Sequence, residues 1–283
     1  MPHFRTITWI LLGALVLLFV TVLVTVYSKQ PTNDRAWAED QKILPYAEFD
    51  SDMVTVKNIR NFSYQSRDEY TPLYYDKTFP ISDIVSIDYI VEPLASVAAA
   101  HTFLSFGLKD GSQIAVSIEI RKEQDEEFSP FKGLFRAYEI MYVVVDERDA
   151  LGLRAVHRDN PVYIYRTIAT PEMSQTLFVD MMRRATALRD TPEFYNTITN
   201  TCATNIVDHI NLVVPNRIGW DYRLLLPMNS DLLAYEQGLL AGDASIEDLR
   251  TAHYASDAIK EHVDSPEFSR AIRSELPGFA TND

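Results

Sequence analysis

An uninterrupted apolar run near the N-terminus constrains the fold of this chain more than any other feature. Ile7 to Val26 reads ITWILLGALVLLFVTVLVTV and carries no charged residue. These twenty residues match the length of a helix that crosses the roughly 30 Å hydrocarbon core of a bilayer. No second run of this kind follows in the sequence. We therefore expect one N-terminal transmembrane helix followed by a soluble body.

The flanks of this run favour an uncleaved anchor over a secretory signal peptide. A signal peptide has a shorter apolar region and a cleavage site of small residues directly after it. Here Tyr27-Ser28-Lys29 follows, and Ala36-Trp37-Ala38 lies too far downstream. Basic residues are nearly balanced on the two sides of the run, so they do not decide its orientation. The commoner arrangement of such an anchor places the body outside the cytoplasm.

The rest of the chain divides by composition into a tether and a folded body. We expect an anchor over 1–27, a polar tether over 28–50, a main domain over 51–214, and a C-terminal helical extension over 215–283 that packs on the same domain. The hydrophobic content of 47% is enough for a real core. The net charge of -14 argues against a nucleic-acid partner, because phosphates would be repelled.

The order of the expected elements indicates the fold class. Runs rich in Val, Ile, Phe and Tyr predict strands at 53–62, 84–91, 101–108, 113–121, 138–145 and 162–166. Helix start signals follow at Thr170-Pro171, at Thr191-Pro192 and before Cys202, and short amphipathic helices are expected at 230–240, 245–262 and 265–276. Strands first and helices afterwards predict an α+β fold, with an antiparallel sheet and packed helices.

Cys202 is the only cysteine of the chain, and it stands where a helix should begin. Polar residues that can cap a helix precede it. One helix face then carries Cys202, Ile206, His209, Ile210 and Val213. A helix N-terminus stabilises a thiolate, so a cysteine in the first turn can act as a nucleophile. The alternative is an inert buried cysteine, which behaves as a small hydrophobic side chain.

A nucleophilic cysteine needs a histidine within reach, and His101 is the best candidate. It enters a strand after the small residues Ala99 and Ala100, which leave room for a facing helix end. The remaining histidines are worse placed, because they precede the span (His3), lie about 10 Å along the same helix (His209), or fall in a loop and in the C-terminal helices (His157, His253, His262).

The hairpin around Lys109-Asp110-Gly111-Ser112 suggests a third member of the site. Its second strand alternates cleanly, with Ile114, Val116, Ile118 and Ile120 on one face. Matching the apolar faces puts His101 on the same face as Ser117, Glu119 and Arg121. Glu119 is the candidate that orients the imidazole, with Ser117, Asn200 and Arg121 as auxiliary candidates. The alternative is that Glu119 only pairs with Arg121 or another surface charge.

Other site chemistries have no support in the sequence. We find no Gly-rich phosphate loop, no paired cysteines and no H-E-x-x-H segment. The sequence therefore predicts neither a cofactor nor a metal ion.

A strand-start histidine that precedes a helix-start cysteine resembles the circularly permuted papain-like thiol enzymes of the NlpC and lecithin retinol acyltransferase type. A closer resemblance, to the Lnb N-terminal periplasmic domain family, rests on separated segments in the same order. These are Val54–Phe62, Ala100–Phe106, Ser117–Glu123, Tyr138-Glu139 with Asp146–Asp149, and Phe194–Thr197 leading to Cys202. The resemblance covers roughly Trp37 to the C-terminus.

This resemblance implies a body on the periplasmic side of the bacterial cytoplasmic membrane, anchored by a single span. It also implies a papain-like thiol domain over 51–214, a link to lipoprotein N-acylation, and His101 and Cys202 as the catalytic pair. One departure from the family pattern stands out. The family often has an asparagine directly before its cysteine, whereas Thr201 stands there and Asn200 lies one position earlier.

Three functions follow from these observations. The first is a cysteine acyltransferase or acyl hydrolase that acts on a lipid or lipoprotein through a thioester on Cys202. The second is a cysteine peptidase or amidase that acts on peptidoglycan or peptides. The third is a non-enzymatic envelope domain in which Cys202 is merely buried. The separation of Cys202 and His101, and the polarity of the walls around them, discriminate among the three.

Overall fold

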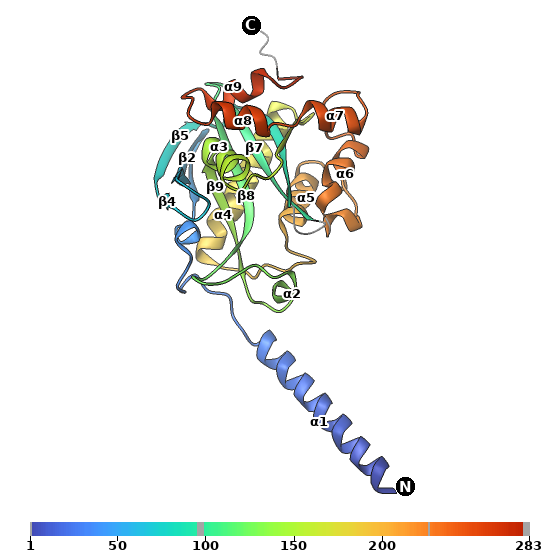
Figure 1. Ribbon diagram of the computed structural model, residues 1–283. Helices are drawn as coiled ribbons and strands as arrows, with labels where there is room; N and C mark the ends of the chain where they lie inside the picture. The colour runs from blue at the N-terminus through green and yellow to red at the C-terminus, as the bar shows by residue number, and fades with distance from the viewer. Residues whose placement is uncertain (1, 95–98, 226, 280–283) are drawn as a thin grey trace.

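The computed structural model describes residues 2–94, 99–225 and 227–279. Helix α1 (Pro2–Tyr27) projects away from a compact body (Figure 1), and most of its apolar side chains from Ile7 onward are exposed. Its segment Ile7–Tyr27 is long and apolar enough to cross a membrane, and an N-terminal signal sequence would have the same properties. The last four residues of the predicted extension, 280–283, lie outside the described residues.

Among the described residues, eight strands form one sheet in the order β1-β2-β9-β8-β7-β6-β10, with β5 also paired to β2. Its strands are β1 (Tyr46–Asp50), β2 (Met53–Arg60), β5 (Tyr74–Pro80), β6 (Ile84–Leu94), β7 (Ala99–Leu108), β8 (Gln113–Arg121), β9 (Glu139–Asp146) and β10 (Tyr163–Arg166). The strands β3 (Ser63–Tyr64) and β4 (Tyr70–Thr71) form a separate pair.

The sheet is mixed, which corrects the expectation of a purely antiparallel one. Strand β2 meets β9 in parallel at Arg60 and Val145, whereas the other neighbours are antiparallel. The α+β class is confirmed. The parallel contact arises because the β6-β7-β8-β9 meander follows β2 in the chain and returns beside it.

The body contains eight α-helices within the described residues. They are α2 (Pro130–Gly133), α3 (Glu147–Gly152), α4 (Pro171–Asp190), α5 (Cys202–Val213), α6 (Ser230–Glu236), α7 (Ile246–Ala252), α8 (Ser256–His262) and α9 (Phe268–Ser274). Short 3-10 turns occur at η1 (Glu39–Gln41), η2 (Ile81–Asp83), η4 (Tyr222–Leu224) and η5 (Pro227–Asn229), and a π-helical turn, η3 (Leu153–His157), continues α3.

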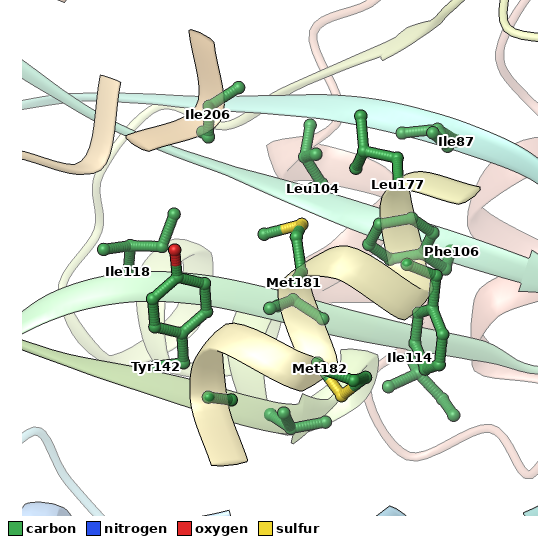
Figure 2. Packing of buried hydrophobic residues seen from close by; sticks show 14 of the residues in the cluster. Ile87, Leu104, Phe106, Ile114, Ile118, Tyr142, Leu177, Met181, Met182 and Ile206 are labelled. Carbon is green, nitrogen blue, oxygen red and sulfur yellow. The ribbon is translucent and has the colours of Figure 1, made fainter. Parts of the chain in front are cut away.

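Two hydrophobic clusters cover the two faces of the sheet. Helices α4 and α5 pack on the face that carries Leu104 and Phe106. Figure 2 shows this packing, with Met181 and Met182 of α4 beside Phe106 and Ile114 of the sheet. Helices α3, α8 and α9 pack on the opposite face. Successive side chains of β7 and β8 point to opposite faces of the sheet, so the two strands contribute to both clusters. Their apolar side chains are buried on both faces.

Two helix starts agree with the sequence, and a third does not. Thr170 caps α4 with Pro171 at its first position, and α5 begins at Cys202. The segment at Thr191-Pro192 is extended instead, because its backbone pairs with the start of β9. Ile140 N donates to Glu193 O, and Tyr195 N donates to Tyr138 O. These ladder bonds replace the helix expected there.

The residues between α1 and the sheet are attached to the body. Arg35 forms an ion pair with Glu139 at 2.9 Å, and the indole of Trp37 lies under the Arg121 guanidinium at 4.1 Å. Strand β1 falls within the range 28–50 assigned to the tether, so ordered sheet begins before residue 51. The end of α1 is therefore joined to the body by only a short segment.

Candidate active site

Helix α5 begins with a complete capping box, and Cys202 is its first residue. Thr201 is the N-cap, and its hydroxyl accepts from the N–H of Thr204 at 3.2 Å. The Thr204 hydroxyl in turn accepts from the N–H of Thr201 at 2.8 Å. Threonine is a strong N-cap residue, so Thr201 explains why the helix starts here. Thr201, the residue directly before Cys202, supplies the cap.

Asn200 braces the turn that leads into the helix. Its amide donates to Phe194 O at 2.8 Å, and its oxygen accepts from the amide of Asn205 at 2.7 Å. The same Asn205 amide donates to Thr201 O at 2.8 Å. Asn200, an auxiliary candidate, thus lies close to Cys202 in the chain. Its side chain stabilises the turn before α5 through Phe194 and Asn205, rather than contacting the thiol.

The sheet splits at the point where α5 approaches it. Strands β7 and β8 pair only as far as Phe103 and Ser117, whereas β7 continues on β6 and β8 continues on β9. In Figure 1, the beginning of β7 lies toward α5, while the end of β8 and the beginning of β9 lie toward α2. The Thr102 hydroxyl, beside the split, donates to the Cys202 sulfur at 3.9 Å. The split lets groups from both strands meet the helix start.

His101 lies on β7 at this split, with the two candidates from β8 beside it. Its Nε2 is 2.7 Å from the Ser117 hydroxyl and 3.7 Å from Glu119 Oε1. Ser117 also donates to Glu119 Oε1 at 2.9 Å. The Phe103 ring stacks on the imidazole, with centroids 5.8 Å apart. The structure therefore brings together three residues that the register of the hairpin placed on one face.

The charges of His101 and Cys202 influence each other, so that each group shifts the pKa of the other. Burial would raise the pKa of the Cys202 thiol, but hydrogen bonding and charge from His101, with support from Thr102, lower it below its ordinary value of 9.0. Burial would lower the pKa of His101, but the Cys202 thiolate and Glu119 raise it above 6.5. Mutual attraction of thiolate and imidazolium thus outweighs burial in both groups.

A buried arginine completes the surroundings of Glu119. Burial opposes ionisation of Glu119, but the charges of His101 and Arg154 lower its pKa to about 2. Arg154 lies 3.3 Å from Glu119 and 2.8 Å from Glu92, and it covers the Phe103 ring at 4.5 Å. Glu119 is therefore an ionised carboxylate held between a histidine and an arginine.

Sequence reasoning missed Thr102, Glu92 and Arg154 as members of the site. Glu92 pairs with His101 in the register of β6 and β7, so a register for that hairpin would have found it. The same register would have identified Thr102, the residue after His101 on β7. Arg154 comes from the π-helical turn η3, and no pattern in the sequence points from there to β8.

Arg121 does not belong to the site around His101. Its guanidinium donates to the carbonyl oxygens of Gln41 and Lys42 and to the side chain of Asn33. It shares a face with Glu119 by alternation, but it stands at the end of β8, where the N-terminal segment covers the sheet. Arg121 therefore ties that segment to the body and does not meet His101.

His209 has partners of its own on α5. Its Nδ1 is 2.6 Å from Asp180, and its Nε2 is 2.6 Å from the hydroxyl of Tyr142. That hydroxyl donates to Asn205 at 3.3 Å, so the network reaches the residue that braces the start of α5. Burial lowers the pKa of His209 despite the Asp180 carboxylate.

An apolar cavity of about 210 Å³ lies next to the start of α5. Thr102 and Ala203, the residues next to His101 and Cys202 in the chain, line one part of it. The rest of the wall comes from the sheet and from α4, α5 and α6, and includes Leu104, Leu177, Ile206, Ile210, Leu233 and Ala234. These side chains are nearly all hydrocarbon, so the cavity suits an apolar ligand.

A second cavity, of about 440 Å³, lies between the end of α1 and the turn before Cys202. Tyr27, Arg136, Asn196 and Asn200 are among its lining residues. It is more polar than the first cavity.

One group with metal-binding potential occurs among the described residues, and it lies elsewhere. Glu261, His262 and Glu275 bring possible ligand atoms within 4.8 Å of one another at the surface of the C-terminal helices. Exposed acidic groups of this kind are common in proteins that bind no metal. The cluster shares no residue with the Cys202 site.

Comparison with known families gives one match. The profile of the Lnb N-terminal periplasmic domain matches residues 70–228, a range that holds both His101 and Cys202. The segment Val54–Phe62 lies outside the matched range. No curated protein and no solved structure matches the chain. Since the profile matches more than half of the sequence, the chain belongs to the Lnb N-terminal periplasmic domain family.

Proposed function

We propose that this protein is a membrane-anchored cysteine acyltransferase or acyl hydrolase of the periplasm. The proposal rests on the pair of His101 and Cys202. The Thr102 hydroxyl, next to His101 in β7, contacts the Cys202 sulfur at 3.9 Å, and Thr102 and Ala203 line one part of an apolar cavity. The pair supplies a thiolate nucleophile and its base. The cavity supplies a place for a hydrocarbon chain next to the reacting sulfur. In this proposal the chain keeps α1 as a single-pass anchor and adopts a permuted papain-like architecture.

The first half of the reaction forms a thioester. His101 takes the proton of Cys202, and the thiolate attacks the carbonyl carbon of an acyl ester. Thr201 caps the N–H of Thr204, but the N–H groups of Cys202 and Ala203 at the start of α5 have no intrahelical acceptor, so they can stabilise the oxyanion. The carbon–oxygen bond then breaks, and His101 returns its proton to the departing alcohol. The acyl chain remains on Cys202, with its tail in the cavity.

The second half transfers or releases the chain. An amine that attacks the thioester carbonyl gives an amide, and water gives a free fatty acid. In both reactions His101 accepts a proton from the attacking group and returns it to the Cys202 sulfur. The link of the family to lipoprotein N-acylation favours the amino group of a lipoprotein as acceptor. The apolar wall favours this chemistry over a peptidase or amidase, which requires a polar cleft.

Trapping the thioester tests the proposal. The full chain in detergent micelles, incubated with phospholipid and a diacylated lipopeptide, should gain the mass of one acyl chain on Cys202. Hydroxylamine should remove that mass, and Cys202→Ala should not gain it. The lipopeptide should gain an amide-linked chain if the protein is a transferase, and free fatty acid should appear if it is a hydrolase. Equal labelling of Cys202→Ala, or digestion of muropeptides without a thioester, would overturn the proposal.

A further inference from the structure

Three large apolar side chains are exposed together on one end of the body. The exposed fractions are 50% for Phe128, 70% for Phe131 and 50% for Ile198. We call these three residues the apolar tip. They belong to one surface, because the Thr197 hydroxyl donates to Pro130 O at 2.7 Å and the Phe128 ring meets Tyr195 edge-on at 6.5 Å.

The conformation of the apolar tip is fixed by the residues around it. Ser129 caps the short helix α2, with Pro130 at its first position, so Phe131 is fixed on the outer side of a helical turn. Gly133 lets α2 lie directly on the neighbouring turn, since a Cβ there would collide with Thr197 Oγ1. Phe131 also packs against Phe135, with ring centroids 4.9 Å apart.

The end of α1 is held at the same side of the body. Arg136, three residues after α2, donates to Tyr27 O at 2.8 Å, and its guanidinium lies 4.9 Å from the Tyr27 ring. It also lies 5.6 Å from the Phe194 ring. In Figure 1, α2 is the labelled element of the body nearest to the end of α1. The apolar tip therefore lies where the chain leaves its transmembrane segment.

We propose that the apolar tip inserts into the surface of the bilayer that α1 spans, and so fixes which side of the body faces the lipids. The inference rests on the proposed anchoring by α1, but not on the thiol chemistry. Aromatic side chains favour the boundary between water and hydrocarbon, and a Phe or Ile side chain that leaves water is stabilised by the hydrophobic effect.

The charges around the apolar tip indicate how it would bind. Lys132 and Arg136 are basic, whereas Asp125, Glu126 and Glu127 directly precede Phe128. Because the two signs nearly cancel, electrostatic attraction to anionic lipids contributes little. Binding should depend on the apolar side chains and should change little with salt or with the anionic lipid content of the membrane.

Docking in this way would connect the bilayer to the active site. The turn that carries Ile198 continues through Asn200 to Cys202, and the second cavity lies between that turn and Tyr27. A lipid in the adjoining leaflet would then need to move only a short way along the protein to reach the thiol. An acyl substrate could enter without crossing bulk water.

Depth measurements with nitroxide labels test the inference on the full chain in phosphatidylcholine proteoliposomes. In a Cys202→Ser background, single cysteines are introduced by Phe131→Cys and Ile198→Cys, with Glu261→Cys on α8 as the control at the far end of the body. Collision with oxygen and with a water-soluble nickel chelate is measured by power saturation. Labels at 131 and 198 should collide more with oxygen and several-fold less with nickel than the label at 261.

Two outcomes would overturn the inference. One is nickel accessibility at 131 and 198 equal to that at 261. The other is protection that disappears when the protein is diluted in the vesicles, which would assign the apolar tip to contact with a second copy. Intact mass of the recovered protein shows whether α1 is retained. Because the experiment uses a chain without its thiol, its failure would leave the proposed acyl chemistry untouched.

Discussion

The Ser117 hydroxyl lies 2.7 Å from His101 Nε2 and donates its proton to Glu119 at 2.9 Å. A serine has one proton to donate, so its oxygen accepts from His101, and Nε2 carries a proton in the neutral ring. The nitrogen left to accept the proton of Cys202 is then Nδ1. In the proposed mechanism, Ser117 thus selects the tautomer in which His101 can act as a base toward the thiol, and Glu119 fixes the orientation of Ser117.

Replacing Ser117 tests this role. Ser117→Ala removes one hydrogen bond to the imidazole and should lower kcat/KM about tenfold, because such a bond is worth about 1.4 kcal/mol. Ser117→Thr keeps the hydroxyl and should restore most of the activity. Steady-state kinetics on a thioester or ester substrate measure both. Wild-type activity in Ser117→Ala, with loss in Glu119→Gln, would instead mean that the carboxylate acts directly across 3.7 Å.

The reactivity of the thiol should depend on pH in a way that His101 controls. In the wild type, the rate of alkylation by iodoacetamide should rise with pH through an inflection below 9.0, because His101 stabilises the thiolate. In His101→Ala only the hydrogen bonds from Thr102 still oppose the effect of burial on the thiol, so the inflection should move to higher pH than in the wild type. Enzymatic activity should fall at higher pH as His101, whose pKa is raised, loses its proton.

His262→Ala is the control for the alkylation experiment. His262 pairs with Glu275 at the surface and lies far from Cys202 in the fold, so its removal should leave the alkylation profile unchanged. An unshifted inflection in His101→Ala would contradict the assignment of His101 as the partner of the thiol.

Filling the apolar cavity should select against long acyl chains. Ala234 of α6 lines the cavity, and Ala234→Phe adds a ring to it. We expect at least a tenfold loss of Cys202 labelling by a palmitoyl probe and little change with an acetyl probe. Ala187→Phe adds the same ring on the exposed side of α4 and should affect neither probe. Equal loss with both probes would show that the cavity does not hold the chain.

The network behind the start of α5 should contribute to stability. Asn205 is buried and bonds to both Asn200 and Thr201, so Asn205→Ala should lower the free energy of unfolding by about 2 kcal/mol. Tyr142→Phe removes the hydroxyl that contacts Asn205 and His209 but leaves the bonds of Asn205 to Asn200 and Thr201, and it should cost about 1 kcal/mol. Urea denaturation of the full chain in micelles measures both. Slower alkylation of Cys202 in Asn205→Ala, but not in Tyr142→Phe, would show that Asn205 positions the thiol.

The parts of the site that lie on one hairpin were open to prediction from the sequence. The clean alternation of β8 placed Ser117 and Glu119 on one face. Matching the apolar faces of β7 and β8 then placed His101 on that same face. The start of α5 was also predictable, since a capping threonine before an apolar helical face is a strong local signal. In both cases the residue types and the local backbone geometry indicate the same structure.

The remaining parts depend on tertiary packing and left no local signal. Thr191-Pro192-Glu193 has the same form as the start of α4, yet its backbone pairs with β9, because a free strand edge lay beside it. Arg154 reaches Glu119 only because α3 and its π-helical turn pack under β8. Arg121 shares the face of Glu119 but meets the N-terminal segment, whose course no alternation pattern predicts.

Thr102 and Cys202 stand 100 positions apart in the chain and meet only when α5 packs on the finished sheet. Contacts between such distant residues form late in folding, because a long loop must close before they are made. We therefore expect that a chain still emerging into the periplasm carries an ordinary, mostly protonated thiol. The thiol would become reactive only in the last steps of folding. A nascent chain would therefore not acylate itself with the ester-linked lipids of the membrane.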